Sequence, residues 1–176
     1  MTVLITGGSK CGKSALAERL FEGFAGEKCY IATMQPYGED ARAAIERHHK
    51  MRAGKGFHTI ECYTGLEKLT LPEGCGVLLE CMGNLCANEM FRPNGIKDPE
   101  RPVLRGIRKL QAQSELLVIV TNEVGSDGIT YTLETMQYIR HLSCINRETA
   151  AMADTVIECV AGIPLVLKGE TPCCIR

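Results

Sequence analysis

The sequence predicts an α/β fold of the P-loop NTPase type, with a mostly parallel sheet that carries helices on both faces. Two observations support this class. Short apolar runs rich in β-branched residues alternate with segments of helical spacing, and a glycine-rich phosphate-loop motif joins the first run to the first such segment. Such alternation implies right-handed crossovers and parallel neighbouring strands. Because ligands of these folds bind at the carboxyl ends of the strands, we expect the functional site there.

Seven apolar runs are expected to be strands, and four segments are expected to be helices. The expected strands are residues 2–6, 29–32, 57–61, 77–80, 116–121, 155–160 and 164–167. The expected helices are residues 14–24, 40–51, 103–113 and 133–142. Residues 92–102 contain three prolines and a glycine, which predicts a long loop.

Length, composition and charge predict an ordinary globular protein. The 176 residues correspond to one domain at roughly 100 to 200 residues per domain, expected at residues 1–170 with a flexible tail at 171–176. The formal net charge of −1 argues against nonspecific binding to nucleic acid or to an anionic membrane. No apolar stretch reaches the roughly 18 residues of a membrane span, and the N-terminus does not resemble a secretory signal. We therefore expect a cytoplasmic protein.

The ten cysteines include no C-x-x-C pair. Only Cys81 with Cys86 and His58 with Cys62 approach the spacing of metal ligands, so reduced thiols are expected rather than a zinc site or disulfides. Adjacent cysteines at positions 173 and 174 are expected on an exposed tail.

A segment near the N-terminus fits the phosphate-loop motif G-x-x-x-x-G-K-[ST]. Its residues are Gly7, Gly8, Ser9, Lys10, Cys11, Gly12, Lys13 and Ser14. Backbone N–H groups of such a loop point at phosphate oxygens, and Lys13 is expected to neutralise the outer phosphates. The Ser14 hydroxyl is expected to bind Mg²⁺ together with a carboxylate at the end of a neighbouring strand, and Glu80 is the candidate. The alternatives are a glycine-rich turn without a ligand and, for Glu80, a helix cap.

Two histidines, His48 and His49, lie among the cations Arg47, Lys50 and Arg52 at the end of an expected helix. Flanking cations disfavour imidazolium, so at least one ring should stay neutral and nucleophilic at pH 7. Such a ring could attack phosphorus while the cations bind the anion. From the residues alone, a solvated basic helix end that complements the helix dipole is the other interpretation.

Further motifs are spread along most of the chain. They are Ile5-Thr6-Gly7-Gly8, Tyr30-Ile31-Ala32-Thr33, His48-His49, Thr59-Ile60-Glu61-Cys62, Leu78-Leu79-Glu80-Cys81, Val120-Thr121-Asn122-Glu123-Val124-Gly125 and Asn146 before residues 150–154. Together they resemble the bifunctional adenosylcobinamide kinase/adenosylcobinamide-phosphate guanylyltransferase family of cobalamin assembly. The Thr-Asn-Glu-Val-Gly segment combined with the histidine cluster is the specific part of this resemblance.

The resemblance implies two reactions that use GTP and Mg²⁺, and it leaves open whether ATP serves the first. Adenosylcobinamide is phosphorylated on its aminopropanol hydroxyl, and GMP is then transferred from GTP to the new phosphate through a GMP-histidine intermediate, which releases pyrophosphate. The family pattern selects His48 as the nucleophile through Ile45 and Arg52, whereas a gap-free count back from Glu61 selects His49. The resemblance also implies a homotrimer.

By matched position, the resemblance implies guanine-nucleotide contacts in the phosphate loop and in four further segments. These contacts fall on Gly7 to Ser14, Ala32, Thr33, Met34, His49, Lys50, Met51, Arg52, Glu61 and Glu80. Glu61 is a candidate acceptor for the guanine N–H groups.

The chain departs from the family pattern after the Thr-Asn-Glu-Val-Gly segment. The usual proline, arginines and Gly-x-x-Asn-Gln signature are replaced by Thr130, Met136, Ile139, Ser143 and Asn146-Arg147. The corrinoid site, or the kinase half of the activity, is the part that this departure affects. A monofunctional P-loop kinase of another hydroxyl substrate and a noncatalytic nucleotide-binding protein are the competing interpretations.

Overall fold

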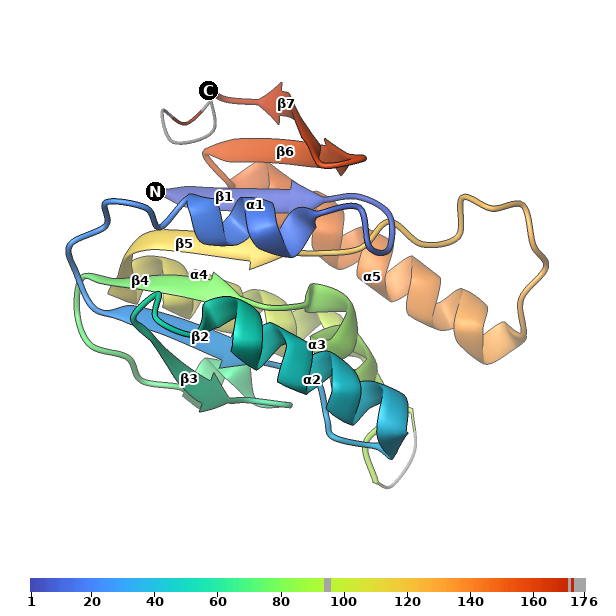
Figure 1. Ribbon diagram of the computed structural model, residues 1–176. Helices are drawn as coiled ribbons and strands as arrows, with labels where there is room; N and C mark the ends of the chain where they lie inside the picture. The colour runs from blue at the N-terminus through green and yellow to red at the C-terminus, as the bar shows by residue number, and fades with distance from the viewer. Residues whose placement is uncertain (94–95, 171, 173–176) are drawn as a thin grey trace.

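The computed structural model describes residues 1–93, 96–170 and 172, and within them the chain forms one seven-stranded sheet. The strands are β1 (Thr2–Thr6), β2 (Lys28–Ala32), β3 (Phe57–Glu61), β4 (Cys75–Leu79), β5 (Ser114–Val120), β6 (Thr155–Val160) and β7 (Ile163–Lys168). Their order is β3-β2-β4-β5-β1-β6-β7 (Figure 1). All neighbours pair in parallel except β7, which is antiparallel to β6. The predicted α/β class is confirmed.

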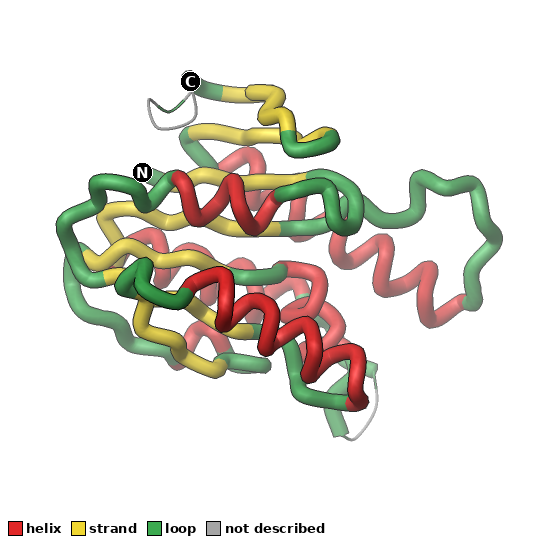
Figure 2. Tube along the Cα trace, in the orientation of Figure 1, coloured by secondary structure: helices red, strands yellow, loops and turns green. Residues whose placement is uncertain are grey.

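Helices cover both faces of this sheet, as predicted. They are α1 (Lys13–Arg19), α2 (Gly38–Arg52), the short 3₁₀ helix η1 (Leu66–Lys68), α3 (Met82–Met90), α4 (Glu100–Gln113) and α5 (Leu133–Met152). Figures 1 and 2 show α1 and α2 on one face and α3, α4 and α5 on the other. None of the helices in the described part of the chain combines the length and the apolar character that crossing a membrane requires.

Strand β1 illustrates why the strands are apolar along their whole length. Val3 and Ile5 pack with Phe21 on the α1 side of the sheet, whereas Leu4 joins the core that contains Leu142 of α5. Successive side chains of a strand point to opposite faces, so a strand covered on both sides buries every residue. The expected strands are therefore all present, with ends within two residues of the expected positions.

Helix α1 is shorter than expected, because it ends at Arg19 instead of residue 24. After this point the N–H groups of Phe21 and Glu22 bond to carbonyls three residues back, at 3.1 and 3.0 Å, which tightens the chain into turns. Gly23 then adopts a φ of 80°, a left-handed conformation that ends helical structure. Conversely, α5 continues ten residues beyond its expected end, to Met152.

The predicted loop at residues 92–102 ends early, because α4 begins at Glu100. Pro102 lies in the first turn of the helix, where a missing N–H costs no intrahelical hydrogen bond. Helix α3 was not among the expected helical segments; its nine residues include Gly83, Asn84 and Asn88, which are weak helix formers. The predicted tail at residues 171–176, with the adjacent cysteines 173 and 174, lies outside the described residues except for residue 172.

Replacement of Leu117 by Ala is expected to lower the free energy of unfolding by about 2–5 kcal/mol. Leu117 lies in the central strand β5 with none of its surface exposed, so the change leaves a cavity. The matched control is Leu133→Ala, where 85% of the side chain is exposed and an effect of at most about 0.5 kcal/mol is expected. Urea-induced unfolding measures both variants, and equal losses would contradict the described core.

Candidate functional site

The phosphate loop connects β1 to α1 and packs tightly against the end of β6. Gly7 and Gly12 have φ angles of 141° and 105°, which side-chain-bearing residues rarely adopt. A Cβ atom on Gly7 would lie 2.5 Å from the carbonyl oxygen of Cys159. The Gly162 N–H also donates to the Cys11 carbonyl at 2.7 Å. Both glycines are therefore required for the curled backbone that the motif predicts.

The Lys13 side chain folds back against this loop. Its ammonium donates to the carbonyl oxygens of Gly7 at 2.9 Å and Gly8 at 2.5 Å, and only 7% of the residue is exposed. A positive charge is thus fixed at the loop by its own backbone.

Ser14 and Glu80, the predicted metal ligands, line the same small cavity at the carboxyl edge of the sheet. Its other lining residues are Ala17, Glu18, Tyr30, Leu78 and Val120. Glu80 is almost completely buried, and its Oε2 accepts a hydrogen bond from the Thr33 N–H at 3.0 Å. The expectation of a neighbouring strand was wrong, because β5 lies between β1 and β4. The two side chains nevertheless line one cavity, because α1, which carries Ser14, packs on β5 beside β4.

Glu18 is a second buried carboxylate in this cavity, and the sequence interpretation missed it. It is 5% exposed and forms an ion pair with the Lys55 ammonium at 2.5 Å. Residues four apart lie on one face of a helix, so Glu18 shares the face of Ser14. The four-residue spacing between Ser14 and Glu18 was the sequence feature that could have predicted this position.

His48 lies on α2 and is half-buried. Burial lowers the pKa of His48 below its ordinary 6.5; the charges of Arg52 and Arg47 lower it further, whereas those of Glu80 and Glu18 raise it. The charges of both cavity carboxylates therefore act on the ring. At pH 7 the imidazole is consequently neutral and has a free ring nitrogen lone pair.

Arg52 follows His48 by one helical turn and lies on the same side of α2. Its guanidinium carbon is 3.3 Å from the centroid of the Tyr30 ring, and the residue is 6% exposed. Among the described residues, nothing accepts a hydrogen bond from its Nη1. A buried cation with a spare donor is well suited to an anionic ligand.

The structure separates other members of the basic cluster from this cavity. Lys50 lies about 200° around the helix from His48, and it pairs with Glu46 at 2.7 Å on the solvent side. His49 is exposed as well. The side chain of Met51 lies outside the described part of the structure.

The predicted contacts at residues 32–34 lie in the segment that follows β2. Thr33 is fully buried, and its hydroxyl donates to the Cys81 carbonyl at 2.9 Å. Asn88 of α3 donates to the Thr33 carbonyl at 2.8 Å. Thr33 thus anchors the segment, while Ala32 and Met34 on either side are partly exposed.

Glu61 lies at the carboxyl end of β3, opposite Ala32 in register, and its Oε2 accepts a hydrogen bond from the Tyr63 hydroxyl at 2.8 Å. Three strands lie between β3 and β1, so at about 4.8 Å per strand Glu61 is roughly 19 Å from the phosphate loop. Glu61 and the loop therefore cannot contact the same part of a bound nucleotide.

The Thr-Asn-Glu segment after β5 is bonded to both the phosphate loop and α5. The Glu123 N–H donates to the Gly7 carbonyl at 3.1 Å. The Thr121 hydroxyl donates to Asn146 at 2.7 Å, and the Asn146 amide donates to the Asn122 carbonyl at 3.4 Å. This network holds α5, the helix with the departures from the family pattern, next to the loop.

A parallel sheet with a phosphate loop after its first strand and a buried carboxylate after β4 defines a P-loop NTPase-like α/β protein. Residues 3–167 match the family described as cobinamide kinase / cobinamide phosphate guanyltransferase. The chain therefore belongs to this family, whose members are enzymes.

Its relatives include two proteins named bifunctional adenosylcobalamin biosynthesis protein CobU, from Salmonella typhimurium and Escherichia coli. Each is 33% identical to this chain over 184 residues, with 96% of this chain and 100% of the relative covered. The bifunctional protein CobP of Pseudomonas aeruginosa is 31% identical, covering 97% and 99%. A solved structure from Pyrococcus horikoshii, with a TM-score of 0.48 and 9% identity over 97% of this chain and 87% of that one, adds nothing to the assignment.

The pKa of His48 is expected to shift in opposite directions when charges around it are removed. Glu80→Gln removes a charge that raises this pKa and should lower it further, whereas Arg47→Gln removes a charge that lowers it and should raise it. NMR titration of the ring protons measures both shifts, with the signal assigned by its loss in His48→Ala. Shifts of the same sign would contradict the described surroundings of the ring.

Proposed function

We propose that this enzyme phosphorylates the aminopropanol hydroxyl of adenosylcobinamide and then transfers GMP from GTP to adenosylcobinamide phosphate through His48. One observation carries the proposal: His48 is one helical turn from the buried Arg52, whose guanidinium stacks on Tyr30, a lining residue of the cavity that Ser14 and Glu80 share. Family membership and the names of the relatives supply the substrate class.

For the kinase step, the backbone N–H groups between Gly7 and Ser14 bind the phosphates of the nucleotide. Lys13 leaves the loop carbonyls to neutralise the charge that develops on the terminal phosphoryl group. That group passes directly to the substrate hydroxyl, without a protein nucleophile. GTP is the proposed donor, and ATP remains the alternative for this step.

The residues of the cavity fit a magnesium ion. Mg²⁺ prefers oxygen ligands, and the Ser14 hydroxyl and the Glu80 carboxylate line one cavity beside the loop. We propose these two as its ligands. When bound, the ion supplies positive charge to the phosphate oxygens.

For the guanylyl step, a ring nitrogen of His48 attacks the α-phosphorus of GTP. A phosphorus–nitrogen bond forms, and the bond to pyrophosphate breaks. A phosphate oxygen of adenosylcobinamide phosphate then attacks the same phosphorus, which releases the imidazole in its original neutral form. Arg52, with its unpaired donor, binds the nucleotide phosphate while this happens. Glu61 remains the proposed acceptor for the guanine N–H groups.

Helical geometry supports His48 rather than His49 as the nucleophile. His48 and Arg52 occupy one side of α2, whereas His49 is exposed. We propose that His49 and Lys50 contribute only at the outer margin of the nucleotide site.

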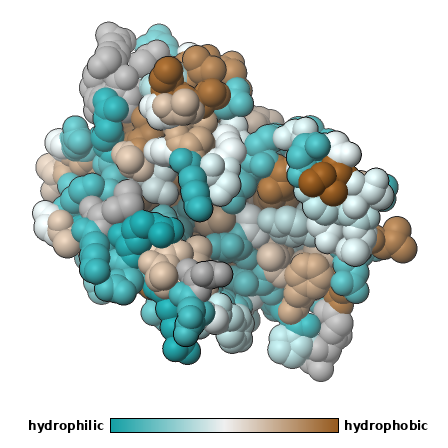
Figure 3. Space-filling view, turned by 45° about the vertical axis from the view of Figure 1, so that its right-hand side comes forward, coloured by the Kyte–Doolittle hydropathy of each residue, from teal (hydrophilic) through white to brown (hydrophobic). Residues whose placement is uncertain are grey.

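Assembly, location and domain boundaries are further parts of the proposal. Figure 3 shows hydrophobic side chains gathered at the top of the molecule, over β6 and β7, and Ile163, Leu165 and Leu167 are exposed along β7. This apolar edge supports a homo-oligomer, for which the trimer remains the proposed form. We also propose a cytoplasmic location and a single catalytic domain at residues 1–170.

Replacement of Lys13 by Ala is expected to reduce both reactions by about 100-fold or more, because both bind phosphates through one loop. The control is Lys68→Ala, an exposed lysine of η1, which should leave both rates unchanged. Separate assays of cobinamide phosphorylation and pyrophosphate release measure the effects. If one reaction kept the wild-type rate in Lys13→Ala, the two reactions would not share the loop.

Replacement of His48 by Ala is expected to abolish the covalent GMP adduct and guanylyl transfer, while part of the kinase activity remains. The matched control His49→Ala should retain the adduct. Mass spectrometry after incubation with GTP, handled at neutral or alkaline pH because a phosphoramidate is acid-labile, detects and maps the adduct. An adduct that persisted in His48→Ala and vanished in His49→Ala would identify His49 as the nucleophile. The absence of an adduct in the wild type would refute the proposed guanylyltransferase activity.

A further inference from the structure

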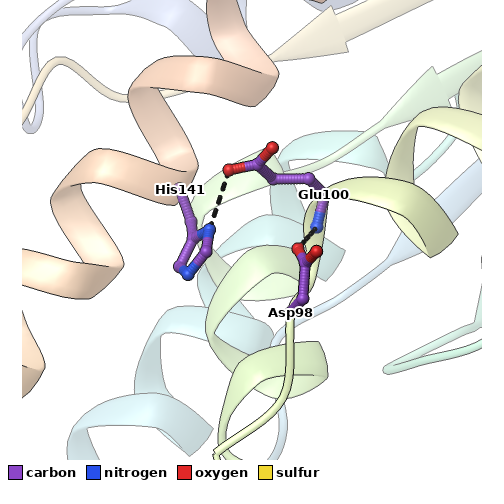
Figure 4. A group of neighbouring side chains, drawn as sticks. All are labelled: Asp98, Glu100 and His141. Carbon is purple, nitrogen blue, oxygen red and sulfur yellow. Dashed lines mark hydrogen bonds and ion pairs between the residues drawn. The ribbon is translucent and has the colours of Figure 1, made fainter.

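A group of three potential metal ligands, with a cysteine beside it, lies between the start of α4 and α5, on the face of the sheet opposite α1. One donor atom from each of Asp98, Glu100 and His141 lies within 4.8 Å of the other two (Figure 4). The Nδ1 atom of His141 is 2.8 Å from Oε1 of Glu100, and the Cys144 thiol donates to Oε2 of the same carboxylate at 3.2 Å. Asp98 approaches from the chain before α4, and its Oδ1 accepts a hydrogen bond from the Glu100 N–H at 2.9 Å.

We propose that Asp98, Glu100, His141 and Cys144 bind one Zn²⁺ ion that joins the start of α4 to the middle of α5. The donor set contains one nitrogen, one sulfur and two carboxylates, which are the ligand types that zinc accepts in tetrahedral sites. His141 and Cys144 are three residues apart on α5, a spacing that puts both side chains on one face of the helix.

Cys144 is outside the three-residue group and contacts it through Glu100, so its side chain must turn toward the ion on binding. Glu100 already contacts both the imidazole and the thiol. An ion that replaces these two hydrogen bonds therefore has Glu100, His141 and Cys144 as nearby ligands. The thiol also accepts a weak contact from Nη2 of Arg147 at 3.7 Å, which it gives up on binding. Zinc binds the Cys144 thiolate, and the thiol proton is released to solvent.

An ordinary ion pair between His141 and Glu100 is the competing explanation. The ion pair accounts for His141 and Glu100, and the hydrogen bond to the Glu100 N–H accounts for Asp98, whereas neither accounts for the Cys144 thiol on the second oxygen of the same carboxylate. The His141 and Glu100 side chains are 27% and 31% exposed, so an ion can reach them from solvent. Four protein ligands leave no open coordination position, which makes the site structural rather than catalytic.

The position of the site is distinct from that proposed for Mg²⁺. Helices α4 and α5 cover the face of the sheet opposite α1 and α2 (Figure 1). Zinc there would add metal–ligand bonds to the polar and apolar contacts that already join α4 and α5. Zinc is expected to raise the free energy of unfolding, because it binds the folded state in preference to the unfolded state.

The first test is zinc titration of the full chain, stripped of metal with a chelator, against a chromophoric competitor. Wild type should bind one zinc ion, and His141→Ala and Cys144→Ser should each weaken binding by at least about 100-fold, since losing even a hydrogen-bonding partner of a ligand costs about 10–100-fold. The matched controls are His58→Ala and Cys62→Ser, the same residue types elsewhere on the chain, which should bind as wild type does. Binding unchanged in the Cys144 and His141 variants would overturn the proposal.

The second test is independent of stability and identifies the sulfur ligand. Cobalt(II) in place of zinc should give a sulfur-to-metal charge-transfer band that Cys144→Ser loses and Cys62→Ser keeps. Circular dichroism of each metal-free variant verifies that it is folded. A wild-type protein that binds no stoichiometric metal, or a cobalt complex without the sulfur band, would show that the cluster is only an ion pair beside a helix cap.

Discussion

The contact between the backbone of Gly7 and the carbonyl of Cys159 is the constraint on which the rest of the site depends. No side chain fits between them, so the phosphate loop is held directly on the end of β6. The Gly162 N–H and the Glu123 N–H attach the same loop to its other neighbours, through the carbonyls of Cys11 and Gly7. Because the loop is fixed in this way, it also fixes the position of Ser14 at the start of α1, beside the cavity that contains Glu80.

The cavity beside the loop combines opposite charges at close range. Glu18 and Glu80 are buried carboxylates, Lys55 pairs with Glu18, and Arg52 stacks on Tyr30, which lines the same cavity. Removing charges from water is costly unless they are paired or hydrogen-bonded. Burial lowers the pKa of His48, which favours the neutral imidazole that a nucleophile requires.

The sequence was sufficient to predict the strands and the loop because both depend on local patterns. Helix ends were predicted less well, since the end of α1 depends on turn hydrogen bonds and on the conformation of Gly23. Glu18 was missed because a charged residue in a helix usually faces solvent. The cluster around Glu100 was missed for another reason: its two halves are some 40 residues apart along the chain, and only the packing of α4 on α5 brings them together.

The stacking of Arg52 on Tyr30 gives the molecule an intrinsic optical probe. The chain contains no tryptophan, so tyrosine emission is not quenched by energy transfer to an indole. The guanidinium carbon lies 3.3 Å from the ring centroid, and a bound phosphate that drew Arg52 toward itself would uncover the ring. The Tyr30 part of the emission, obtained as the difference between the wild type and Tyr30→Phe, therefore reports on movement of the last turn of α2, without any dye attached near the nucleophile.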